Sequence, residues 1–231
     1  MTVLVTGCAG FIGFHLSSKL LSKYEVVGID NLNNYYDPNI KKDRLLILKK
    51  QKKFKFYKKD ISDLANLKKI FNKHKIKYIV HLAAQAGVRY SIDHPDKYVS
   101  SNLVGFFNVL EVARLFKVKH MIFASTSSVY GNNKKFPLKE KYNTDKPLSF
   151  YAATKKSNEV MAHAYSNIYK LPCTGLRFFT VYGPMGRPDM SLFKFSDAII
   201  NNKTIELFNK GNHYRDFTYV DDIVTSICKL L

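Results

Sequence analysis

Short apolar runs alternate with longer amphipathic stretches from Val3 to Phe178. The apolar runs are rich in β-branched and aromatic residues and predict strands at Val3–Thr6, Val26–Ile29, Lys55–Tyr57, Tyr78–Leu82, Met121–Ser125 and Thr174–Phe178. The stretches between them predict helices at Ile12–Lys23, Lys41–Lys50, Leu64–Lys73, Asp96–Phe116 and Tyr151–Tyr169. This alternation is typical of βαβ units. We therefore expect an α/β fold of Rossmann type, a doubly wound parallel sheet of about seven strands flanked by helices.

The pattern loosens after Gly183. It predicts a helix near Leu192–Asn201, strands near Ile205–Phe208 and over Tyr214–Tyr219, and a last helix that begins at Asp221. We therefore divide the chain into a first domain, residues 1–183, and a second region, residues 184–231.

The first strand runs into three glycines spaced three apart, Gly7, Gly10 and Gly13. Such glycines let the backbone approach a phosphate closely, and N–H groups at the start of the next helix then face the ligand. Asp30 ends the second strand, where an acid can bind both hydroxyls of an adenosine ribose and repel the 2′-phosphate of NADP. The turn and Asp30 together predict a bound dinucleotide rather than a glycine-rich turn that binds nothing. No arginine stands beside Asp30 in the sequence to receive a 2′-phosphate, so the predicted dinucleotide is NAD.

Tyr151 and Lys155 are four residues apart and lie on one face of a predicted helix, which follows a Ser/Thr cluster at a strand's carboxyl end. A lysine cation and a positive nicotinamide nearby would both lower the pKa of the tyrosine and make it a base. Tyr142 and Lys146 have the same spacing, but they lie in a polar stretch that ends at Pro147 and predicts a loop.

Composition narrows the class of protein. The 231 residues carry a formal net charge of +19, mostly from lysines spread over predicted solvent-facing surfaces, so nucleic-acid binding is a minor alternative. A positive field would instead attract a nucleotide with an anionic sugar.

No apolar run approaches a membrane span and no signal peptide precedes the first strand. Cys8, Cys173 and Cys228 are isolated, so we expect no metal site and a reducing, cytoplasmic location.

Several motifs together carry a resemblance to a known family. They are the Gly7–Gly13 turn, the Tyr151/Lys155 pair, the cluster from Ser125 to Gly131, and the segments Leu82–Arg89, Arg177–Pro184 and Arg215–Asp222. The chain resembles the extended, sugar-nucleotide branch of the short-chain dehydrogenases/reductases, the NAD-dependent epimerases and dehydratases. Within that branch it is most similar to UDP-glucuronate 4-epimerases, notably through Asp30–Asn33 and Gly186–Met190.

The resemblance implies a nucleotide-sugar 4-epimerase that converts UDP-glucuronate to UDP-galacturonate through a 4-keto sugar. Its catalytic residues would be Thr126, Tyr151 and Lys155. NAD would be bound by Gly7, Gly10, Phe11, Ile12, Gly13, Asp30, Asn31, Asn33, Asp60, Ile61, Leu82, Ala83, Ala84, Gln85, Asn102, Tyr151, Lys155 and Phe178. The sugar nucleotide would be bound by Arg89, Thr126, Ser127, Ser128, Thr180, Arg187 and Arg215, with Arg187 facing the uronate carboxylate and Arg215 the diphosphate.

Other reactions and a non-catalytic role stay open at this stage. UDP-galactose 4-epimerase and UDP-glucuronate decarboxylase use the same scaffold. Related 4,6-dehydratases are disfavoured, because they carry an Asp-Glu pair where this chain has Ser127 and Ser128. Family members continue beyond the helix that begins at Asp221, so the resemblance implies that residues 184–231 begin a small substrate domain that is incomplete here, and an inactive NAD-binding module is a further alternative. A homodimer is expected, through the helices at Asp96–Phe116 and Tyr151–Tyr169.

Overall fold

A parallel six-stranded sheet forms the centre of the computed structural model, which describes residues 1–212 and 214–231. Its strands are β1 (Thr2–Thr6), β2 (Glu25–Asp30), β3 (Phe54–Lys58), β4 (Ile76–His81), β5 (His120–Thr126) and β6 (Cys173–Phe178). They follow the order β3-β2-β1-β4-β5-β6, so the direction of strand addition reverses between β1 and β4. This is the Rossmann order, in which ligands bind at the reversal point, outside the carboxyl ends of the strands.

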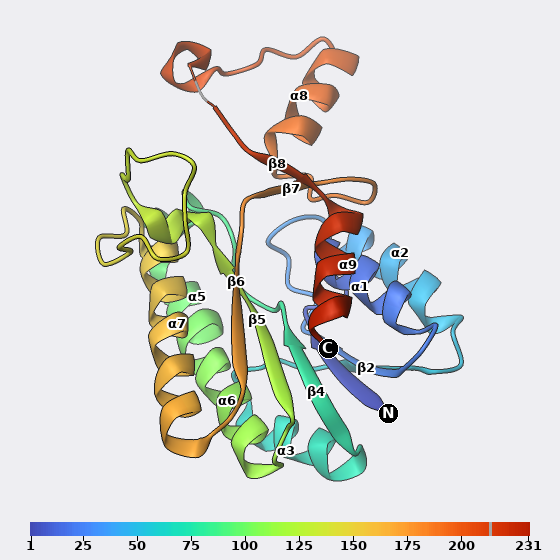
Figure 1. Ribbon diagram of the computed structural model, residues 1–231. Helices are drawn as coiled ribbons and strands as arrows, with labels where there is room; N and C mark the ends of the chain where they lie inside the picture. Colours follow the sequence, from blue (N-terminus) through green and yellow to red (C-terminus); the bar gives the residue numbers. More distant parts are fainter. Residues whose placement is uncertain (213) are drawn as a thin grey trace.

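Helices cover both faces of the sheet (Figure 1). One face carries α1 (Phe11–Leu20), α2 (Pro38–Lys49) and α9 (Val220–Leu230), and the other carries α3 (Leu64–Lys73), α6 (Gly105–Leu115) and α7 (Phe150–Tyr169). Short helices α4 (Tyr90–Asp93) and α5 (Pro95–Tyr98) and a π-helical segment (Val99–Val104) lead into α6. All five residues of β1 are buried, as expected for a parallel strand enclosed by helices on both faces.

The expectation of about seven strands in one sheet is wrong. A seventh strand, β7 (Thr180–Tyr182), follows β6 after one irregular residue, but it pairs with β8 (Phe217–Tyr219) in a separate two-stranded parallel sheet. Gly183, with φ of 149°, follows the last residue of β7, and from there the chain leaves the strand and leads to α8. The helix α8 (Ser191–Ile200) and this small sheet project beyond the carboxyl edge of the main sheet (Figure 1).

The strand predicted near Ile205–Phe208 is also wrong. Residues 205–207 have no regular structure, and a single 3-10 turn follows at Phe208–Gly211. Glu206 and Leu207 are both exposed, and within residues 1–212 and 214–231 no strand pairs with this segment, so its apolar residues have no sheet to join. Strand β8 is shorter than the predicted Tyr214–Tyr219. In the described part of the chain no helix is long and apolar enough to cross a membrane.

Candidate active site

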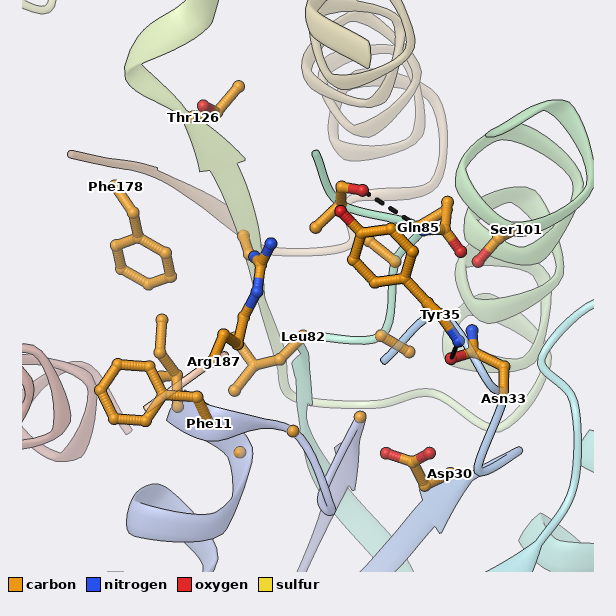
Figure 2. A pocket seen from close by; sticks show the side chains of 18 of the residues that line it. Phe11, Asp30, Asn33, Tyr35, Leu82, Gln85, Ser101, Thr126, Phe178 and Arg187 are labelled. Atoms are coloured by element: carbon orange, nitrogen blue, oxygen red, sulfur yellow. Dashed lines mark hydrogen bonds between the residues drawn. The ribbon is translucent and has the colours of Figure 1, made fainter. Parts of the chain in front are cut away.

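A cavity opens at the carboxyl ends of β1, β4 and β5, next to the reversal point of the sheet (Figure 2). The residues that line it come mainly from the loops after β1, β2, β3, β4 and β7, from the ends of strands and from α1 and α7. They include Gly7, Gly10, Phe11, Ile12, Gly13, Asp30, Asn31, Asn33, Ile61, Leu82, Ala83, Ala84, Gln85, Thr126, Tyr151, Lys155, Phe178 and Arg187. Most of the sequence-predicted cofactor residues therefore lie around a single cavity.

The turn after β1 is shaped for a phosphate group. The Gly7 N–H donates to the Ile29 carbonyl at 2.7 Å, and the Gly10 N–H donates to the Gly7 carbonyl at 3.0 Å. Gly7 has φ of 71°, and a Cβ on it would lie 2.8 Å from the backbone nitrogen of Ala83. A Cβ on Gly13 would collide with the Gly7 carbonyl. The Gly7 and Gly13 positions therefore accept no side chain, and α1 begins directly behind the turn, which fits a pyrophosphate at the helix N-terminus.

Asp30 lies at the far side of this turn and is 8% exposed. Its Oδ2 accepts the Ala9 N–H at 3.1 Å and its Oδ1 accepts the Leu32 N–H at 2.9 Å. Burial raises its pKa, while these N–H groups and the Lys41 ammonium act in the opposite direction. Lys41 lines the cavity and donates from Nζ to the Asn33 carbonyl at 2.9 Å and to its Oδ1 at 2.6 Å.

An arginine does lie near Asp30, although none stands beside it in the sequence. Arg44, on α2, is completely buried and close enough to affect the Asp30 pKa. Its Nη1 donates to the Ala9 carbonyl and the Tyr36 hydroxyl, and its Nη2 donates to the carbonyls of Met185 and Gly186. Because both terminal nitrogens are bound to protein oxygens, Arg44 braces the phosphate turn and is not presented to a 2′-phosphate.

Two other predicted cofactor residues act behind the cavity wall. Asn102 is 1% exposed; its Oδ1 accepts the Gln85 N–H at 2.8 Å and its Nδ2 donates to the Gln85 carbonyl at 3.0 Å. It therefore fixes the loop that lines the cavity after β4. Asp60 accepts the Asn31 side-chain amide at 2.7 Å and the Ser62 hydroxyl and N–H. Burial works to raise the Asp60 pKa, but these hydrogen bonds outweigh it and lower the pKa.

Tyr151 and Lys155 enter the cavity from the first turns of α7, which the Ser149 hydroxyl caps by accepting the Ala152 N–H at 3.1 Å. Burial raises the pKa of Tyr151, and the Thr126 hydroxyl and Arg187 oppose that rise. Lys155 is buried, and its Nζ donates to the Ala124 carbonyl at 2.8 Å. Burial lowers the pKa of Lys155 to about 8.

The expected lowering of the Tyr151 pKa by Lys155 is therefore not found in this structure. Lys155 points to a backbone oxygen, and desolvation dominates at the phenol.

The four hydroxyl side chains from Ser125 to Ser128, at the end of β5 and just after it, have different roles. Thr126 lines the cavity, and its Oγ1 accepts the Ser128 N–H at 3.2 Å. Ser127 and Ser128 form the 3-10 turn that follows and are not among the cavity-lining residues. Ser125 donates to Glu159 Oε1 at 2.6 Å, and Glu159 forms a two-point ion pair with Arg177. This network fastens the end of β5 to α7, next to Tyr151.

The arginines predicted for the sugar nucleotide are not gathered in one place. Arg187 lines the cavity and forms an ion pair with Asp189. Arg89 precedes α4, Thr180 lies on β7, and the exposed Arg215 donates to the Tyr214 carbonyl at 2.8 Å. None of these three is among the described residues that line the cavity.

Sequence reasoning missed Tyr35, Tyr36, Lys41 and Met190, which line the cavity, and Asp189, which pairs with Arg187. The available signals were the polar, aromatic composition of residues 31–38 and the Gly186–Met190 motif, which contains Asp189 and Met190.

Comparisons with known proteins agree with this geometry. The family model described as "NAD dependent epimerase/dehydratase family" matches residues 3–231. Protein CapI of Staphylococcus aureus is 54% identical over 100% of this chain and 69% of its own length. A protein named "Probable UDP-glucuronate 4-epimerase" from Rhizobium meliloti is 50% identical over 100% of this chain and 68% of its own length.

The solved structures similar to this chain include UDP-sugar 4-epimerases. The crystal structure of UDP-glucuronic acid 4-epimerase from Bacillus cereus, in complex with UDP-glucuronic acid and NAD, has a TM-score of 0.91 at 37% identity; the match covers 100% of this chain and 73% of that one. A UDP-glucose 4-epimerase from Thermotoga maritima, solved with UDP-glucose, has a TM-score of 0.86 at 34% identity, covering 98% and 72% of the two chains. The chain thus belongs to the NAD-dependent epimerase/dehydratase family, and its cofactor is NAD.

Proposed function

We propose that this chain catalyses the NAD-dependent 4-epimerisation of UDP-glucuronate to UDP-galacturonate. The observation that carries the choice of substrate is Arg187, a cation in the same cavity as Thr126 and Tyr151. A neutral hexose offers no anion to this guanidinium, whereas a uronate carboxylate matches its charge and planar shape. The half-identical relative from Rhizobium meliloti and the Bacillus cereus structure support the same substrate. In this proposal residues 1–183 hold NAD, and residues 184–231 contribute Arg187 to the sugar side.

The roles of the residues follow from their positions. The Gly7–Gly13 turn and Asp30 would hold NAD, which when bound would supply a reversible acceptor for a hydride from C4 of the sugar. Tyr151 takes the proton of the 4-hydroxyl, and Thr126 aligns that hydroxyl. Lys155, whose Nζ donates to the Ala124 carbonyl in this structure, would favour the ionised phenol by turning its ammonium toward Tyr151, because burial raises the pKa of that phenol.

A 4-keto uronate is a β-keto acid and loses carbon dioxide readily. An epimerase must therefore hold the carboxylate so that its bond to the ring is poorly aligned with the carbonyl π system. Arg187 is the charged group available for that restraint, and the Thr126 hydroxyl lines the same cavity. The same polar groups separate this activity from that of a decarboxylase.

Product analysis tests the proposal. The purified chain is incubated with NAD and UDP-glucuronate, UDP-glucose or UDP-galactose in turn, and the sugar nucleotides are separated. We expect UDP-galacturonate from UDP-glucuronate, and we expect Tyr151→Phe to abolish turnover while NAD stays bound. Arg187→Ala should increase the pentose by-product. Release of carbon dioxide as the main reaction would instead identify a decarboxylase, and turnover of neutral hexoses alone would identify a UDP-galactose 4-epimerase.

We also propose a homodimer formed through the helices at the α6 and α7 side of the sheet. Large apolar side chains are exposed there: Val104, Phe107 and Leu115 before and along α6, and Val160, Ile168 and Tyr169 on α7. Sedimentation should give a dimer for the wild type and a monomer for Phe107→Glu. A wild type that sediments only as a monomer would refute the dimer.

A further inference from the structure

Arg187 is held on one side by a second residue of its own loop. Its Nε donates to Asp189 Oδ1 at 3.0 Å, and its Nη2 donates to Asp189 Oδ2. The two side chains are 25% and 22% exposed, so the pair is largely withdrawn from solvent. A largely buried guanidinium needs such a counter-charge, since an unpaired buried cation is costly.

The carboxylate of Asp189 is in turn held by a residue from the opposite half of the cavity. The Tyr35 hydroxyl, in the loop after β2, donates to Asp189 Oδ2 at 3.1 Å across 154 positions of sequence. Burial, reinforced by the charge of Asp189, raises the pKa of Tyr35 to about 12, so its hydroxyl keeps the proton that it donates.

The position of Tyr35 is itself restricted. A Cβ on Gly87 would collide with the Tyr35 hydroxyl, so the phenol lies directly against a backbone position that has no side chain. Its ring packs edge-on against Tyr90 with centroids 4.9 Å apart. Loops after β2, β4 and β7 therefore meet at this one phenol.

These contacts leave one edge of the Arg187 guanidinium for a ligand. A guanidinium can bind a carboxylate along its Nε/Nη2 edge or along its Nη1/Nη2 edge. Asp189 takes the first edge, and no hydrogen bond within the described residues takes Nη1. Figure 2 places the Arg187 side chain inside the cavity, between Phe178 and Tyr35.

We propose that Tyr35 and Asp189 are positioning residues that fix the Nη1/Nη2 edge of Arg187 toward a carboxylate on the sugar, and so determine the preference for a uronate over a neutral hexose. This inference rests on the proposed function. Tyr35 and Asp189 act through Arg187: Asp189 holds its inner edge, and Tyr35 holds Asp189.

Steady-state kinetics on the NAD-loaded protein test the idea. KM and kcat are measured for UDP-glucuronate and for UDP-glucose with the wild type, Tyr35→Phe and Asp189→Asn. Asp189→Asn should raise KM for UDP-glucuronate about tenfold, because it removes the charge that pairs with Arg187. Tyr35→Phe should raise it about threefold, because it removes one hydrogen bond to the Asp189 carboxylate. KM for UDP-glucose should change less than about twofold, because that substrate has no carboxylate to orient.

Tyr57→Phe is the matched control. It also removes a phenol oxygen with a partner, in this case His74 Nε2 at 2.8 Å, but on β3 away from the cavity lining. It should leave both KM values unchanged. Bound NAD and the thermal midpoint of each variant show that the fold is retained.

A double-mutant cycle separates positioning from general loosening of the loop. In an Arg187→Ala background, Tyr35→Phe and Asp189→Asn should cause no further rise in KM for UDP-glucuronate. Equal effects in both backgrounds, or an equal rise in KM for both sugar nucleotides, would overturn the inference while leaving the proposed function intact. A wild type that turns over UDP-glucose but not UDP-glucuronate would refute the proposed function, and the inference with it.

Discussion

His81 should make the fold sensitive to mild acid. It ends β4, is 1% exposed and contacts the Phe106 ring edge-on at 5.3 Å between centroids. Thr6 Oγ1 lies 2.8 Å from His81 Nδ1, within hydrogen-bond distance, and also accepts the Ala83 N–H at 3.2 Å. A charged imidazole in this buried position would lose its hydration without gaining a counter-charge.

The size of the effect follows from the pKa. Burial, with a smaller contribution from the Lys155 charge, lowers the pKa of His81 from 6.5 to about 3. Between these values the unfolded chain binds a proton that the folded chain does not, so stability is present above pH 6.5 and is lost as the pH falls. At pH 5 the loss is about 2 kcal/mol, from 1.5 pH units below the unfolded pKa at about 1.4 kcal/mol per unit.

Urea unfolding at pH 7.5 and pH 5.0 measures this loss. His81→Asn keeps an acceptor for the Thr6 hydroxyl and does not titrate, so its unfolding free energy should fall by about 2 kcal/mol less than that of the wild type over this interval. His163→Gln, which replaces an exposed histidine on α7, is the control and should follow the wild type. Identical pH dependence in His81→Asn and the wild type would refute the reasoning.

Three further predictions concern the cavity and its support. Gly13→Ala should abolish retention of NAD, measured as cofactor released on denaturation, because its Cβ meets the Gly7 carbonyl; normal NAD content would contradict this. Asp30→Ser should weaken NAD binding about tenfold and strengthen NADP binding in fluorescence titrations, since Lys41 stays beside the ribose site; unchanged preference would contradict it. Glu159→Gln should lower the unfolding free energy by about 1–3 kcal/mol, because it removes the charge that pairs with Arg177 in a part-buried network. Asp197→Asn, in an exposed ion pair, should change it little, and equal losses would show that burial of the Glu159 pair adds nothing.

The main sheet could be predicted from the sequence, because the residues of each of its strands form a recognisable apolar run. The six main strands and the flanking helices follow from local apolar patterns, and each of the six strands predicted for the main sheet overlaps an observed one. The small sheet did not follow, because β7 continues the pattern of β6 and only its distant partner β8 separates it from the main sheet. Ile205 shows the converse, a β-branched residue in a segment that finds no partner strand.

The residues of the candidate site also fall into two groups, those that a local sequence pattern predicts and those that depend on contacts between distant loops. The Gly7–Gly13 turn, Asp30 and the Tyr151/Lys155 pair have meaning within a few residues, and all line the cavity. Asn102 does not line the cavity itself; it hydrogen-bonds the backbone of Gln85, which does. Tyr35 and Asp189 were missed because their contact joins loops that are remote in sequence, which no spacing rule describes.

The neighbouring positions of β1 and β4 also couple cofactor retention to folding. Leu4 pairs with Ile79, so about 75 residues must be ordered before the cavity has both walls. NAD is thus a ligand of the folded state alone, and each tenfold excess over its dissociation constant adds about 1.4 kcal/mol to the free energy of unfolding. Loss of the cofactor therefore lowers the free energy of unfolding, and unfolding releases the cofactor.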